Sequence, residues 1–335
     1  MFSDARLEGR ACEMPGVHTR TLALAGRCPY PAPVWSVAKL VGGSGPPSRL
    51  AVAGHRRHVA KGGAMHTSIQ DLVVLTEVPD LDGVRFLARA VVAREDELAA
   101  VLADAITAGL LGPAPHLLAA WRQRVTGGLP PSVEQRDAMA AYLLPDFREE
   151  VDSDTRLLGA VSEHLWAFLA PELDGRWGRP IHVEHDHFSV IDHGLDGLSL
   201  YDRPPPLGFR LWEAKRHTGQ GSVTTVITDA GQQLDSNGAT YLARISKVLQ
   251  TSRDPRVQSV AARIVEVWQA RGEQAAVGIA VGRTSDDQMP RRPMKGLADR
   301  FAFGDPGRYE ALVIEVSNLH GFAASVREAI KSGLD

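Results

Sequence analysis

Cysteine is scarce in this sequence, which contains only Cys12 and Cys28 among its 335 residues. Both lie in an N-terminal stretch whose composition argues against a packed core. A disulfide framework and a cysteine-based zinc site are therefore excluded, and the low cysteine content is typical of a cytoplasmic protein. We expect the protein to reside in the cytoplasm.

Long apolar runs are also missing. No segment approaches the roughly 18 to 20 consecutive apolar residues that a membrane-spanning helix needs. The N-terminus has no charged segment followed by an apolar one, so we expect no secretory signal. The hydrophobic fraction of 44% and the charged fraction of 23% are typical of a globular chain that buries a core. We therefore expect no membrane partner.

Excess positive charge is missing as well, because the formal net charge is -3 at pH 7. Binding of nucleic acid would then depend on a local basic patch, or on metal ions that bridge carboxylates to phosphates. The sequence also lacks a Gly-rich phosphate loop ending in Lys-Ser or Lys-Thr, which excludes an ATP motor of that type. It has no nucleophile elbow, which argues against a Ser-His-Asp hydrolase.

The first 64 residues stand apart from the rest of the chain. They are rich in Gly, Pro, Arg and Ser, and residues 42–47 read GGSGPP. Such a composition cannot bury enough apolar surface to offset the entropy lost on ordering. Two explanations remain open: residues 1–64 are a disordered tail, or they are an artefact and translation begins at Met65.

Residues 65–148 are predicted to form a small α+β accessory or interaction module. Strand-like runs at residues 72–75 and 84–88 are separated by a turn. A helix is expected at residues 95–110, where apolar side chains recur at the helical period. The pattern becomes helical again after the Gly/Pro-rich break at residues 127–131. No set of residues in this module indicates chemistry.

Residues 149–335 contain the succession of elements expected of an α/β domain. Apolar positions at the 3.6-residue period predict a helix at residues 154–169, which Pro171 stops. Further strands are expected at residues 181–188, 195–201, 208–216, 275–281 and 311–316, with helices at 223–250 and 257–271 between the third and fourth of them. This order predicts a mixed sheet flanked by helices.

The candidate residues for chemistry lie on two of these strands. Glu213 and Lys215 are two residues apart in a strand, so their side chains project from the same face of the sheet. Trp212 and Ala214 point the other way, into a core covered by helices. Asp196 begins the preceding strand, and a hairpin between the two strands brings its carboxylate close to Glu213.

Two carboxylates with a backbone carbonyl nearby suit Mg²⁺ or Mn²⁺, which are hard ions that prefer oxygen ligands. A metal in such a site lowers the pKa of a bound water and stabilises charge on a phosphodiester. Lys215 adds a cation that orients the water or neutralises the transition state. The alternative is a solvent-facing hairpin with an ordinary Glu–Lys ion pair, which contributes little to stability on a surface.

Both strand segments resemble the motifs of a known superfamily. Residues 193–197 read HGLDG and residues 211–215 read LWEAK, which resemble the motifs of the PD-(D/E)xK nucleases with their restriction-endonuclease-like order of elements. Within that superfamily, residues 150–320 are similar to the nuclease domain of the bacterial Hachiman anti-phage subunit HamA and its relatives. The resemblance implies a metal-dependent endonuclease that cuts DNA in anti-phage defence alongside a helicase partner.

The resemblance also implies roles for individual residues. Asp196 and Glu213 match the positions of the metal ligands, and Lys215 matches the catalytic lysine. Glu163, on the preceding helix, matches an additional acidic ligand position that many members have. A second acid near the first motif, Asp192, leaves the identity of the first carboxylate open, and the Pro-rich turn between the strands leaves their register open.

Substrate-binding residues are expected around this centre. Superfamily members often place a glutamine on the helix after the lysine, where it holds substrate or water, and Gln233 occupies such a position beside Gln232. An ordinary polar helix face is the alternative explanation. The side chains that could supply positive charge to phosphates are Arg216, His217, Arg244 and Lys247.

Two other hypotheses remain. In the first, the fold serves only as a nucleic-acid- or protein-binding module without catalysis. In the second, the protein is a zinc enzyme, because His185 and His187 share a strand face and lie among other histidines and acids. No closed four-ligand set emerges from the zinc candidates His182, His185, His187 and His193. The nuclease remains the main prediction.

Overall fold

The computed structural model describes residues 69–76, 88–147, 153–185, 195–202, 207–219, 222–285 and 294–335. The expected tail at residues 1–64 lies outside these ranges, as do Asp192, His187 and His193. The described residues belong to one compact unit, Ala64–Asp335. None of their helices is both long and apolar enough to span a membrane.

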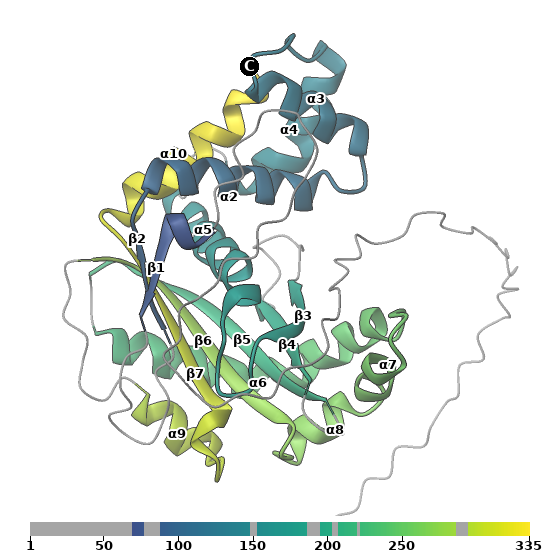
Figure 1. The fold of residues 1–335 in the computed structure, drawn as a ribbon, viewed down its shortest axis with the longest axis vertical. Coiled ribbons are helices and arrows are strands. Elements are labelled where there is room, and N and C mark those ends of the chain that lie inside the picture. The colour runs from purple at the N-terminus through teal and green to yellow at the C-terminus, as the bar shows by residue number, and fades with distance from the viewer. Residues whose placement is uncertain are drawn as a thin grey trace, which may run out of the picture. The chain divides into compact units, whose positions relative to one another are not determined.

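Seven strands of the described residues form one mixed sheet with the order β1-β2-β7-β6-β5-β4-β3 (Figure 1). The four central strands β2, β7, β6 and β5 run parallel, and β1, β4 and β3 run antiparallel to their neighbours. Their bounds are β1 (Val73–Thr76), β2 (Ala88–Val92), β3 (Pro180–His185), β4 (Gly197–Tyr201), β5 (Gly208–His217), β6 (Ala275–Thr284) and β7 (Tyr309–Val316).

Helices cover both faces of this sheet and complete a three-layer arrangement (Figure 1). One face packs Trp212 and Ile314 against α2 (Glu95–Leu110), α3 (Pro115–Val125), α4 (Val133–Phe147), α5 (Ser153–Leu169) and α10 (Leu319–Ser332). The other face packs Leu211 and Val277 against α6 (Val223–Leu249), α7 (Pro255–Ala261), α8 (Ile264–Gln269) and α9 (Lys295–Phe301). A short helix, α1 (Ile69–Leu72), precedes β1. The predicted mixed sheet flanked by helices is confirmed.

Individual elements agree with the sequence pattern to different degrees. The helix predicted at residues 95–110 is α2, and the helix predicted at residues 223–250 is α6. The single helix expected at residues 257–271 was wrong, because this stretch forms the two short helices α7 and α8. A strand is found at Ala88–Val92, which shares only Ala88 with the strand expected at residues 84–88, and residues 84–87 lie outside the described residues.

The segment expected to form the accessory module contributes to the same sheet as the rest of the chain. Strand β2 pairs in parallel with β7, which lies more than 200 residues later in the sequence, as the pairing of Ala88 with Leu312 shows. Helices α2, α3 and α4 share a hydrophobic core with α5 and α10. The boundary expected near residue 148 therefore divides neither the sheet nor this core.

Two buried ion pairs cross the sheet, and the sequence pattern did not reveal them. Arg210 on β5 lies 2.5 Å from Glu310 on β7, and the two side chains are 0% and 1% exposed. Arg283 on β6 lies 2.5 Å from Glu315 on β7, and both of these side chains are fully buried. Because a buried charge without a partner costs several kcal/mol, each of these residues depends on the other member of its pair.

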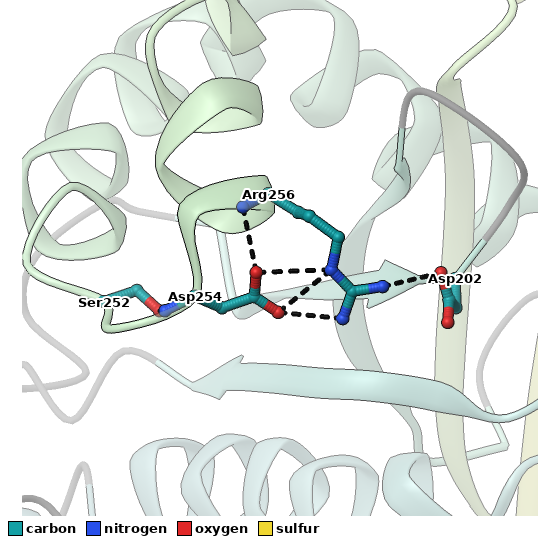
Figure 2. A network of polar contacts seen from close by, with 4 residues as sticks. All are labelled: Asp202, Ser252, Asp254 and Arg256. Carbon is teal, nitrogen blue, oxygen red and sulfur yellow. Dashed lines mark hydrogen bonds and ion pairs between the residues drawn. The ribbon is translucent and has the colours of Figure 1, made fainter.

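A polar network lies at the carboxyl end of strand β4. Figure 2 shows Arg256 of α7 between two carboxylates. The guanidinium lies 2.8 Å from Asp254, the N-cap of α7, and 3.0 Å from Asp202, which directly follows β4. These side chains are largely exposed, so the network contributes little to stability, but it links the end of β4 to the helix layer.

Two glycines of the sheet leave room for side chains of helix α5. A Cβ at Gly197 would lie 2.1 Å from the ring of Trp166, and one at Gly282 would lie 2.7 Å from Oγ of Ser162. Trp166 and Ser162 are both on α5, on either side of Glu163. The glycines therefore set the position of the helix that carries this predicted site residue.

A pair of glycine substitutions tests this packing. We expect Gly197→Ala to lower the free energy of unfolding by about 1–3 kcal/mol, because the methyl group overlaps Trp166. Gly159→Ala is the matched control, because a Cβ at this position of α5 meets nothing within 4 Å. This control should stabilise the protein by about 0.5–1 kcal/mol, since alanine is the better helix former. Urea denaturation of both variants measures the effects, and equal effects would contradict the packing argument.

Candidate active site

Strand β5 places Trp212 and Ala214 on one face of the sheet and Glu213 and Lys215 on the other, as the alternation predicted. Trp212 and Ala214 belong to the core on the α5 side. Leu211 belongs to the core on the α6 side, and Lys215 contacts Gln233 of α6. Glu213 and Lys215 therefore lie together on the face that α6 covers.

The hairpin register brings Asp196 to Glu213. Strands β4 and β5 pair antiparallel with Gly197 opposite Trp212, so the residue before Gly197 lies opposite the residue after Trp212. The backbone N–H of Asp196 donates to the carbonyl of Trp212 at 3.3 Å. The backbone N–H of Ala214 donates to Oδ2 of Asp196. The register that the Pro-rich turn left open is thus the one that joins the two carboxylates.

Lys215 connects this carboxylate pair to helix α6. Its ammonium group donates to Oε1 of Glu213, and also to Oε1 of Gln233 at 2.8 Å. The Lys215 side chain is 29% exposed, whereas the Glu213 side chain is 1% exposed. The second carboxylate oxygen of Glu213, Oε2, is buried and accepts no hydrogen bond from the described residues.

Burial raises the pKa values of both carboxyl groups. The pKa of Asp196 rises to about 6 because of its burial, although the charge of Lys215 and the Ala214 N–H oppose the rise. The pKa of Glu213 lies well above its ordinary value because of burial and the nearby charge of Asp196, against the opposing effect of Lys215. One lysine therefore does not fully compensate the buried carboxylate of Glu213 together with the half-buried carboxylate of Asp196, and the site favours an additional positive charge.

The donor chemistry of this pair fits a hard divalent cation. Asp196 and Glu213 supply carboxylate oxygens, and Oε2 of Glu213 is buried without a hydrogen-bond donor among the described residues. Glu163 contributes electrostatically, since its charge also raises the pKa of Glu213. In the described part of the chain, no three His, Cys, Asp or Glu side chains are grouped as a metal site. The residues present thus fit Mg²⁺ or Mn²⁺ through two carboxylates.

The predicted substrate-binding residues fall in different places. Gln233 holds Lys215, as described, while the neighbouring Gln232 is exposed. Arg216 points to the opposite face from Lys215 and donates to the backbone carbonyl of Thr155 on α5; burial lowers its pKa. His217 is buried at the end of β5. Gln233 is therefore the member of this predicted set that the structure brings to the carboxylate pair.

The histidines predicted as zinc candidates are engaged in other contacts. The Nε2 atom of His182 lies 2.9 Å from Glu184. The ring of His185 lies 4.9 Å from that of His164 on α5. His187 and His193 fall outside the described residues, so the predicted set is described only in part.

One row of charged residues at the carboxyl edge of the sheet was not predicted. Arg283 lies opposite His217 in the pairing of β5 with β6, and opposite Glu315 in the pairing of β6 with β7. Glu315 also accepts from Arg89 of β2 at 2.8 Å. Charged residues at strand ends resemble ordinary surface residues in a sequence, and only the strand order reveals that they are neighbours.

Comparison with protein-family models finds no matching family, and comparison with curated proteins finds no matching relative. The interpretation of the site therefore depends on its geometry and on the motif resemblance.

Because the negative charges of Asp196 and Glu213 are incompletely compensated, removal of one of them should stabilise the protein. Without metal and at neutral pH, we expect Glu213→Gln to raise the free energy of unfolding by about 1–3 kcal/mol, because it removes a buried, incompletely compensated negative charge that lies beside a second carboxylate. Glu310→Gln is the matched control, since Glu310 is equally buried but pairs with Arg210. This control should destabilise the protein by about 3 kcal/mol, because it leaves a buried cation unpaired.

The stabilisation expected of Glu213→Gln should depend on pH. A carboxyl group whose pKa is raised on folding favours the folded state at low pH, and this contribution is lost as the pH rises through the folded value. The difference in stability between Glu213→Gln and the wild type should therefore shrink as the pH falls through the raised pKa of Glu213 toward the ordinary value of a glutamate. Denaturation curves in the presence of a chelator measure this, and a difference that is constant with pH would contradict the account.

Proposed function

We propose that the protein is a divalent-metal-dependent phosphodiester hydrolase, a nuclease. The observation that supports this most directly is the placement of Asp196 opposite the buried Glu213, with one unsatisfied carboxylate oxygen on Glu213 and with Lys215 beside it. A surface hairpin with an ordinary Glu–Lys pair would keep both groups in water, whereas Glu213 is 1% exposed. The unsatisfied oxygen of the buried Glu213 destabilises the fold unless it binds a further donor or cation.

Each residue has a role in this proposal. Asp196 and Glu213 hold Mg²⁺ or Mn²⁺, which, when bound, lowers the pKa of a water and offsets negative charge on the phosphate. Lys215 is partly exposed and supplies positive charge to the transition state. Gln233 restrains the flexible lysine by accepting from its ammonium group at 2.8 Å. Glu163 adds negative charge from α5.

DNA is the proposed substrate, with an endonuclease role in bacterial anti-phage defence and a helicase partner. The support for these finer points is the resemblance of residues 193–197 and 211–215 to the Hachiman nuclease subunit. The mixed sheet flanked by helices and the antiparallel hairpin that carries both motifs agree with the order of elements in that superfamily. The role of a non-catalytic DNA-binding module is the outcome to be distinguished by experiment.

Cleavage assays test the proposed activity. With Mg²⁺ or Mn²⁺, the full chain should cut plasmid DNA, and a chelator should abolish cutting. Asp196→Asn, Glu213→Gln and Lys215→Ala should each lower the rate by at least about a hundredfold, because each removes a group that acts in the transition state.

Matched variants control for nonspecific effects of charge removal. Glu172→Gln and Lys295→Ala alter an exposed acid and an exposed lysine elsewhere on the protein, and they should leave the rate within about twofold of wild type. Cutting that survives both Glu213→Gln and Lys215→Ala would overturn the assignment. Binding of DNA without cutting under any of these conditions would favour the non-catalytic module.

A further inference from the structure

Helix α6 carries a polar stripe that begins at the candidate active site. Gln233 contacts Lys215 at one end of this stripe. Further polar side chains follow at steps of three or four residues, which places them on the same side of the helix. The stripe consists of Gln233, Asn237, Thr240, Arg244 and Lys247.

The exposure of these side chains changes along the helix. Gln233 and Asn237 are half-buried, and Thr240, Arg244 and Lys247 are exposed. The apolar residues of α6, including Leu234 and Leu242, point toward the core instead. The stripe therefore leads from the half-buried lysine of the site to the exposed surface of the helix.

The charge of this stretch differs from that of the whole protein. Residues 236–253 contain no Asp or Glu but include Arg244, Lys247 and Arg253, whereas the full chain has a net charge of -3. Arg244 and Lys247 have no ion-pair partner among the described residues. The nearest acid on the helix, Asp235, is occupied by Arg271 and Arg300. The outer part of the stripe is thus a local positive patch.

Helix stability does not account for both cations. A cation in the last turn is favoured by the helix dipole, which explains Lys247. Arg244 lies more than one turn before the end of α6, where the effect of the dipole has faded. Like charges three residues apart on a helix repel each other by a few tenths of a kcal/mol. The arrangement therefore suits an anion that contacts both side chains.

We propose that this stripe of α6 is the track along which the phosphodiester backbone of a DNA substrate runs away from the cleavage site. The proposal rests on the nuclease function proposed above. From Gln233 to Lys247 the helix rises about 21 Å, at about 1.5 Å per residue. With one phosphate per about 3.4 Å along each strand, the track spans about six nucleotides. Arg244 and Lys247 contact phosphates at its far end.

DNA binding, measured separately from cutting, tests the track. The probe is a fluorescently labelled DNA duplex longer than the about six base pairs that the track spans. It is titrated with the full-length Glu213→Gln chain, in which cleavage is blocked, over a range of salt concentrations. Arg244→Gln with Lys247→Gln, added to this chain, should weaken binding by about tenfold. The slope of log affinity against log salt should fall by about 2, since each lost phosphate contact removes about 0.9.

A second pair of cations provides the control. Arg136→Gln with Arg263→Gln removes the same charge from two exposed positions on other elements, α4 and the start of α8. This control should change affinity by less than about twofold and leave the salt slope unaltered. All these positions are exposed, so thermal denaturation should show that each variant is folded.

The possible results distinguish a failure of the track from a failure of the proposed nuclease function. If both double variants lower the salt slope equally, or if neither does, the track is overturned while cutting by the wild type leaves the nuclease assignment intact. If the Glu213→Gln chain binds no DNA and the wild type cuts none, both proposals fail. A loss of affinity and salt slope confined to Arg244→Gln with Lys247→Gln supports the track.

Discussion

The placement of the half-buried Asp196 beside the buried Glu213 is the constraint around which the rest of the site is arranged. The strand register places the two residues opposite each other, the charge of Asp196 raises the pKa of Glu213, and one lysine only partly compensates the two negative charges. The raised pKa values of Asp196 and Glu213 reflect this incomplete compensation, since both result mainly from the loss of solvent. Two incompletely compensated carboxylates lower the stability of the fold, and such a loss of stability is typical of residues kept for function.

The surrounding elements each contribute to holding this pair. The β4–β5 hairpin fixes the register, and the Ala214 N–H holds one oxygen of Asp196. Helix α5 reaches the sheet closely because Gly197 and Gly282 have no side chains. Helix α6 supplies Gln233 to the lysine and continues outward with its polar stripe. The site therefore combines a rigid strand pair with a helix that leads to the surface.

Strand alternation made the central part of the site predictable, since Glu213 and Lys215 are two residues apart in an apolar strand. The pairing with Asp196 followed from the hairpin, and the long helix α6 from its period. The parallel pairing of β2 with β7 was not predictable, because contacts between distant segments leave no local pattern. For the same reason, the sequence did not reveal that Arg210 pairs with Glu310 or that Gln233 holds Lys215.

The thermal stabilisation of the protein by Mn²⁺ at neutral pH tests the central claim most directly. A ligand that binds only the folded state at about a hundred times its dissociation constant adds about 2.7 kcal/mol of stability. We expect Mn²⁺ to raise the melting temperature of the wild type strongly and that of Glu213→Gln little. An equal rise in both proteins, or none in the wild type, would contradict the claim that Asp196 and Glu213 are built to hold a divalent cation.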